Sequence, residues 1–130
     1  MLGKKWIVVC AAAFVLVAGC RDSATPTDSR TVHHVVVCWL KEPGNREAQD
    51  KLISVSRSLG NIPGVVSVSV GRVLPSERPV VDSSFDVAMV LTFKDKETLT
   101  AYLEHPEHKK ATKETLEPLV KKILIYDFVE

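Results

Sequence analysis

The sequence predicts an α+β fold in which a four-stranded antiparallel sheet carries its helices on one face. Three observations predict it: apolar residues alternate in several short segments, they recur at helical spacing in others, and turn residues separate the segments. The resulting order of strand, helix, strand, strand, helix, strand is that of a βαββαβ plait. At 130 residues, 45% of them hydrophobic and 25% charged, the chain has room for one packed domain.

The first half of the plait is predicted within residues 32–70. Segment 32–40 is apolar at both parities, so we expect both faces of this strand to be covered. Gly44-Asn45 follows as a helix start and Gly60 as its stop, and alternation over 66–70 predicts the second strand. The apolar face of the predicted helix consists of Ala48, Leu52, Val55 and Leu59.

The second half begins with a proline-containing loop and a strand at 85–93, one face of which holds Phe85, Val87, Met89, Leu91 and Phe93. Asp95 can cap a second helix, whose shared apolar face consists of Leu99, Tyr102 and Leu103. His105-Pro106 interrupts this helix, and Pro106 is placed to open a further helical stretch. A last strand is predicted at 123–129.

The face of the sheet away from the helices is also predicted to be apolar. In the last strand Ile123 and Ile125 occupy one parity, while the other consists of Leu124, Tyr126 and Phe128. Helices on one side leave one of these sets in water, which a soluble domain avoids. We therefore expect a homodimer whose sheets pack face to face, and a heteromeric partner is the alternative.

The start of the chain has the features of a lipoprotein signal. Lys4 and Lys5 precede an uncharged apolar run too short to span a bilayer comfortably, and the run ends in Leu-Val-Ala-Gly-Cys at 16–20. This ending resembles the lipobox of bacterial lipoprotein precursors, which implies that Cys20 becomes a lipid-modified N-terminus carrying acyl chains such as palmitate. An ordinary secretory signal or an uncleaved anchor is the alternative.

The predicted organisation is therefore a signal at 1–19, a lipidated Cys20 with a flexible tether to residue 30, and a domain at 31–130. We expect the domain in the bacterial cell envelope, anchored on the outer face of the cytoplasmic membrane or on the outer membrane. Arg21 at the position after the cysteine favours the outer membrane under the enterobacterial sorting rule. Cys38 is then left without a cysteine partner and is expected to be a small buried apolar residue.

Charge argues against a nucleic-acid partner. The chain has 17 Lys and Arg against 16 Asp and Glu, and loss of the two lysines of the signal leaves the domain close to neutral. A basic face of the kind that neutralises phosphates is not indicated.

Four segments, at 34–41, 86–93, 102–108 and 123–128, resemble the stress-responsive dimeric α/β-barrel family, known as Dabb. The Tyr-x-x-His-Pro-x-His pattern at 102–108 is the sharpest of them. The resemblance runs over nearly the whole domain, and it implies a ferredoxin-like plait that dimerises into an α/β barrel.

Plant polyketide cyclases of this family have a site that the chain is similar to at three positions. The resemblance implies His108 as a general base, Tyr102 as a hydrogen-bond donor and His34 as a pocket residue, with no cofactor. A neutral imidazole suits proton removal beside a carbonyl group. The alternative is structural: His105 caps a helix, His108 packs as a satisfied histidine, and Tyr102 fills the core.

Two function classes follow. A domain that binds a small apolar ligand, with no assigned reaction, is favoured, because an extracytoplasmic lipoprotein has no evident access to polyketide intermediates. A cofactor-free lyase or cyclase acting through His108 and Tyr102 is the alternative, and a cavity reaching both side chains is what would favour it. No metal site is expected, because His33 and His34 must point to opposite faces of their strand.

Overall fold

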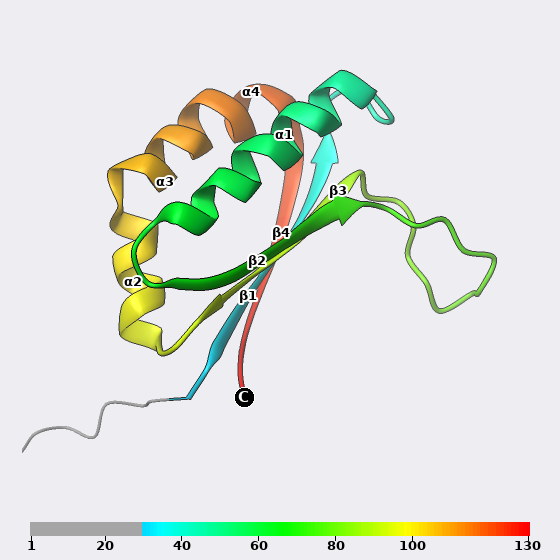
Figure 1. Ribbon diagram of the computed structural model, residues 1–130. Coiled ribbons are helices and arrows are strands. Elements are labelled where there is room, and N and C mark those ends of the chain that lie inside the picture. The colour runs from blue at the N-terminus through cyan, green and yellow to red at the C-terminus, as the bar shows by residue number, and fades with distance from the viewer. Residues whose placement is uncertain (1–29) are drawn as a thin grey trace, which may run out of the picture.

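A computed structural model describes residues 30–130 of the chain (Figure 1). The predicted signal and Cys20 lie outside the described residues. Across residues 30–130, no helix combines the length and apolarity needed to cross a membrane.

The described chain forms an antiparallel sheet with strand order β2-β3-β1-β4, and all of the helices lie on one of its faces (Figure 1). The predicted ferredoxin-like plait and its α+β class are confirmed. In chain order the elements are β1 (Val32–Leu40), α1 (Arg46–Ser58), a 3₁₀ turn η1 (Leu59–Asn61), β2 (Val65–Arg72), β3 (Val87–Phe93), α2 (Lys96–Glu104), α3 (Pro106–Ala111), a π-helical turn η2 (Thr112–Leu116), α4 (Glu117–Leu119) and β4 (Val120–Val129).

The helices begin where their capping residues predict. The Asn45 side chain accepts a hydrogen bond from the backbone N–H of Ala48 at 3.1 Å, and Asp95 accepts one from the N–H of Thr98 at 2.8 Å. Each cap satisfies an amide that the first turn of a helix leaves free. Pro106 stands in the first turn of α3, where its missing N–H costs nothing.

The core lies between the helices and the facing side of the sheet. Alternate residues of β1 and β3 are buried, as their strand pattern predicts. Cys38 is among the fully buried side chains, and burial raises the pKa of its thiol to about 11. The prediction that Cys38 is a small buried apolar residue is therefore confirmed.

The edge strand β4 differs from the expectation, because both of its faces are exposed. Ile123 and Ile125 pair with residues of β1 that face the helices, yet 38% and 50% of their surface is accessible. On the opposite face Tyr126 is 55% and Phe128 52% exposed. The helices cover the inner strands and leave β4 open on both sides, so more apolar surface is exposed than the sequence predicts.

Two residues do not lie on the buried faces that the sequence predicts for them. Phe85 precedes β3 instead of belonging to it, because the carboxylate of Asp86 accepts backbone hydrogen bonds from Leu40 at 2.9 Å and Gly44 at 2.7 Å and the chain bends there. Leu103 is 36% exposed, because α2 ends one residue later and packs through other side chains.

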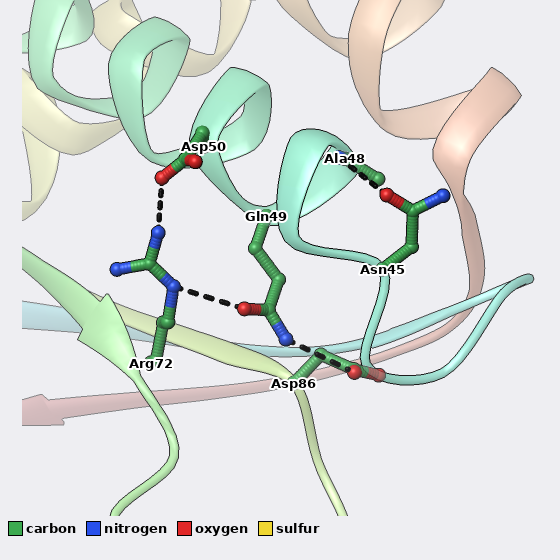
Figure 2. A network of polar contacts seen from close by, with 6 residues as sticks. All are labelled: Asn45, Ala48, Gln49, Asp50, Arg72 and Asp86. Atoms are coloured by element: carbon green, nitrogen blue, oxygen red, sulfur yellow. Dashed lines mark hydrogen bonds and ion pairs between the residues drawn. The ribbon is translucent and has the colours of Figure 1, made fainter.

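A polar network ties α1 to the end of the sheet (Figure 2). Gln49 donates from its amide nitrogen to Asp86 at 3.5 Å and accepts at its oxygen from Arg72 Nε at 2.9 Å. The Arg72 guanidinium also pairs with Asp50. The network joins α1, β2 and the residue before β3, and it holds the helix layer in register over the sheet.

Candidate functional site

The three predicted site residues come from different elements and meet on the helix-facing side of the sheet. Tyr102 of α2 lies between His34 of β1 and His108 of α3, with ring centroids 6.4 Å and 4.6 Å away. The parity of β1 turns His34 toward the helices, and the break at Pro106 lets α3 bring His108 back onto Tyr102. We call these three residues the histidine–tyrosine cluster.

His108 has one ring nitrogen engaged and one free for a ligand. Its Nδ1 lies 3.1 Å from the carbonyl oxygen of Leu103, which can only accept, so Nδ1 carries a proton. In the neutral ring Nε2 then holds the lone pair. Burial lowers the pKa of His108, against the opposing effect of the Leu103 carbonyl, and His108 is therefore neutral at pH 7.

His34 is oriented by a carboxylate that the sequence interpretation missed. Its Nδ1 lies 2.6 Å from Oδ1 of Asp127, the residue directly opposite it on β4. His34 is buried, whereas half of the Asp127 side chain is exposed. The carboxylate fixes the ring and the proton on Nδ1. The available signal was a lone acidic residue within the apolar last strand.

Tyr102 is a buried core residue with an unpaired hydroxyl group. It is 2% exposed, and its ring packs on Phe93 with centroids 5.0 Å apart. Within residues 30–130 its hydroxyl has no hydrogen-bond partner. Burial raises the pKa of Tyr102, so the hydroxyl stays protonated and can donate. The alternative prediction that Tyr102 fills the core is confirmed. Its hydroxyl group can still donate a hydrogen bond.

His33 and His105 lie apart from the cluster. His33 stacks on Phe128 on the open side of the sheet, with centroids 4.7 Å apart, so the prediction that His33 and His34 face opposite ways is confirmed. His105 caps α3, because its Nδ1 accepts from the N–H of Glu107 at 3.2 Å. Among the described residues no three His, Cys, Asp or Glu side chains gather as a metal would require.

A cavity of about 410 Å³ lies beside α3, between it and the end of α1. Apolar side chains form part of its wall and polar ones the rest; the wall includes Leu59, Ile62, His105, Lys110 and Ala111. Neither Tyr102 nor His108 lines this cavity. The rings of Tyr102 and His108 pack directly against each other. Of the two histidines in the 102–108 pattern, His105 therefore lies at the cavity, whereas His108 lies against Tyr102.

Residues 32–130 match the family described as the stress responsive A/B barrel domain. The chain belongs to this family, and the resemblance that the sequence suggested is confirmed. It is 24% identical over 108 residues to a stress-response A/B barrel domain-containing protein of Arabidopsis thaliana, and the match covers 83% of this chain. The chain spans only 40% of that relative's length.

Solved structures share the fold. A dimeric ferredoxin-like protein of unknown function from Thermobifida fusca has a TM-score of 0.65 at 17% identity, with 80% of this chain and 94% of that chain covered. The hydroxynitrile lyase from Passiflora edulis has a TM-score of 0.64 at 22% identity, with 78% and 94% covered. At these identities the likeness is one of fold. The match covers nearly all of each solved chain.

Proposed function

We propose that this protein is a lipid-anchored homodimer that binds a small, largely apolar molecule with one polar group in the cavity beside α3. The cavity is the observation that carries the proposal: a volume of about 410 Å³ lies in the range that small ligands occupy. The tight packing of Tyr102 against His108 favours binding in this cavity over chemistry between those two rings.

The chemistry of the wall indicates the kind of ligand. Leu59, Ile62 and Ala111 offer an apolar surface, whereas His105 and Lys110 lie at the same cavity with N–H groups that can donate. His105 accepts at Nδ1, so in its neutral form Nε2 carries the proton. A ligand with an apolar body and a carbonyl, hydroxyl or anionic group satisfies both parts of this wall.

The cavity can be tested by filling it. Ala111 is buried on the cavity wall, and Ala111→Phe places a ring in the space. Ala101→Phe on the exposed side of α2 is the matched control. We expect the fluorescent probe 8-anilinonaphthalene-1-sulfonate to bind the wild type and the control, and to bind Ala111→Phe at least about tenfold more weakly. Equal binding by the two variants, with equal melting temperatures, would reject the cavity as the site.

A cofactor-free lyase is the second candidate, and the free Nε2 of His108 favours it. Passiflora edulis has a hydroxynitrile lyase of this fold. In such a reaction Nε2 accepts the proton of the substrate hydroxyl, the electrons of that O–H bond form the carbonyl, and cyanide leaves with the electrons of the C–C bond. The Tyr102 hydroxyl is a donor for the developing cyanide or carbonyl.

Cyanide release from mandelonitrile tests this candidate. His108→Gln removes the free base, and His105→Gln, at the N-cap of α3, is the control. Activity lost in His108→Gln and kept in His105→Gln would support the lyase. Release no faster than in buffer would leave the binding function as the account of this site.

The lipid anchor is tested independently of the domain. We expect the full chain, expressed in a bacterium with labelled palmitate, to incorporate label, and Cys20→Ser to lose it. Cys38→Ser is the control, because Cys38 is buried in the domain. Label in both cysteine variants, or in neither the wild type nor Cys38→Ser, would contradict anchoring at Cys20.

A further inference from the structure

The loop between β2 and β3, residues 73–86, carries the most exposed large apolar side chains among the described residues. Leu74 is 83% exposed and Val80 82%. A soluble monomer gains nothing from holding two such side chains in water within one loop, and surfaces of this kind mark interaction sites.

The loop is shaped by its own hydrogen bonds. The N–H of Val73 donates to the Asp86 carbonyl at 3.2 Å, and that of Val81 donates to the Arg78 carbonyl at 3.0 Å. The N–H of Ser84 donates to the Asp82 side chain at 2.8 Å. The apolar side chains are therefore presented by a formed turn.

The loop also rests on the open side of the sheet. Trp39 belongs to the parity of β1 that faces away from the helices, and its Nε1 donates to Ser84 Oγ at 3.1 Å. The ring of Phe85 lies edge-on to it, with centroids 6.4 Å apart. In Figure 1 the loop extends past the end of the sheet on the side away from the helices. Trp39 thus joins the end of the loop to the open face of the sheet, on which Tyr126 is exposed.

One hydroxyl in the loop has no hydrogen bond. Within residues 30–130, Oγ of Ser83 is the one side-chain polar atom that is fully shielded from solvent and has no hydrogen-bond partner. An unpaired buried hydroxyl is costly, and it is independent of the apolar exposure. Both observations indicate that the loop lacks contacts that a second molecule would supply.

We propose that loop 73–86 is an arm that grips a second copy of this chain through Leu74 and Val80. The inference rests on the proposed homodimer and adds a contact to it. Two-fold symmetry places each arm against the partner's surface, so the contact is made twice.

The position of the loop argues against a membrane as its partner. Val32, where the domain begins after the tether, pairs with Phe93, at the opposite end of β3 from the loop. The pair Arg72 and Val87, which flanks the loop, marks the other end of the sheet. The tether and the arm therefore leave opposite ends of the domain.

The test is sedimentation equilibrium of the chain beginning at Arg21, which contains all of the described residues 30–130. In Leu74→Ser with Val80→Ser the dimer dissociation constant is expected to rise about tenfold or more, because each dimer loses the burial of four apolar side chains. Glu77→Ser, in the same loop, is the control and is expected to leave the constant unchanged. Both variants should melt with the wild type at concentrations where all are monomeric, since these side chains are exposed.

The outcomes separate the two proposals. A wild type that stays monomeric would overturn the homodimer and the arm together. A wild-type dimer whose constant is the same in the double variant would overturn the arm and leave the sheet-face dimer standing. Binding to phosphatidylglycerol vesicles that the double variant loses, with an unchanged dimer, would assign the loop to a lipid surface and also overturn the arm.

Discussion

At the scale of single residues, His34 and His108 share one arrangement. In each ring Nδ1 forms a hydrogen bond, with the Asp127 carboxylate in His34 and with the Leu103 carbonyl in His108. Among the described residues, Nε2 of each ring has no hydrogen-bond partner. The three residues that the 102–108 pattern and the first strand suggested do come together. Asp127 escaped the sequence interpretation because its role depends on the β1–β4 register, which periodicity alone does not define.

The titration of His108 is predicted to be acid-shifted. Because burial lowers its pKa, the folded chain binds this proton less readily than the unfolded chain, whose histidine has a pKa of about 6.5. The ionisation of His108 thus contributes little to stability at pH 7, and it destabilises the fold as pH falls below the unfolded pKa. Between pH 7 and pH 5, the free energy of unfolding is expected to fall more in the wild type than in His108→Gln.

Urea unfolding at both pH values measures this difference, and an NMR titration gives the midpoint directly. His105→Gln, at the N-cap of α3, controls for the loss of a nearby histidine. A His108 midpoint at or above the ordinary histidine range would contradict the assignment of a neutral ring.

Asp86 is predicted to be the most sensitive polar residue of the network in Figure 2. It accepts from the backbone amides of Leu40 and Gly44, and Asp86→Ala leaves both without a partner. We expect a loss of about 2 kcal/mol or more in the free energy of unfolding, with a smaller loss in Asp86→Asn, which keeps one acceptor oxygen. Equal losses in a urea titration would mean that the backbone amides find water instead.

At the scale of elements, caps and periodicity predicted the helices well. Asn45, Asp95 and Pro106 all stand where helices start. The errors arose from tertiary contacts. Phe85 continues the alternation of β3 in sequence, yet hydrogen bonds to Asp86 bend the chain before the strand begins. The exposure of Ile125 could not be predicted, because it depends on how far the helices extend over the edge strand.

The turn between η1 and β2 is predicted to depend on the absence of a side chain at Gly64. Gly64 and Gly44 both have a positive φ, but a Cβ on Gly64 would strike the methyl group of Thr98, whereas Gly44 has open space. Gly44→Ala is expected to cost about 1 kcal/mol, from the backbone conformation alone, and Gly64→Ala clearly more. Thr98→Ser removes the methyl and keeps the hydroxyl, so it should recover part of the loss in a double variant. Chemical denaturation that finds no recovery would contradict the steric explanation.

At the scale of the whole molecule, the open sheet face and the exposed edge strand call for a partner. The sequence predicted the need for one, and a relative of the same fold is described as dimeric. Which surface of the chain is left bare was only partly predictable, since the loop 73–86 has no periodic pattern from which its position could be inferred.

The open face of the sheet is predicted to form the dimer interface. Tyr126→Asp places a charge on the exposed apolar face, and the dimer is expected to dissociate at micromolar concentration. Lys121→Asp, on the exposed start of the same strand, is the control and should remain dimeric. Size-exclusion chromatography with light scattering measures both, and a dimeric Tyr126→Asp would place the interface elsewhere.

Native mass spectrometry of the chain beginning at Arg21, purified gently from bacterial extract, tests ligand binding and dimerisation together. We expect a dimer that carries a reproducible small molecule, which is absent from Ala111→Phe and present in Ala101→Phe. A dimer that is empty under every condition of purification would contradict the binding function, and a stable monomer would contradict the assembly itself.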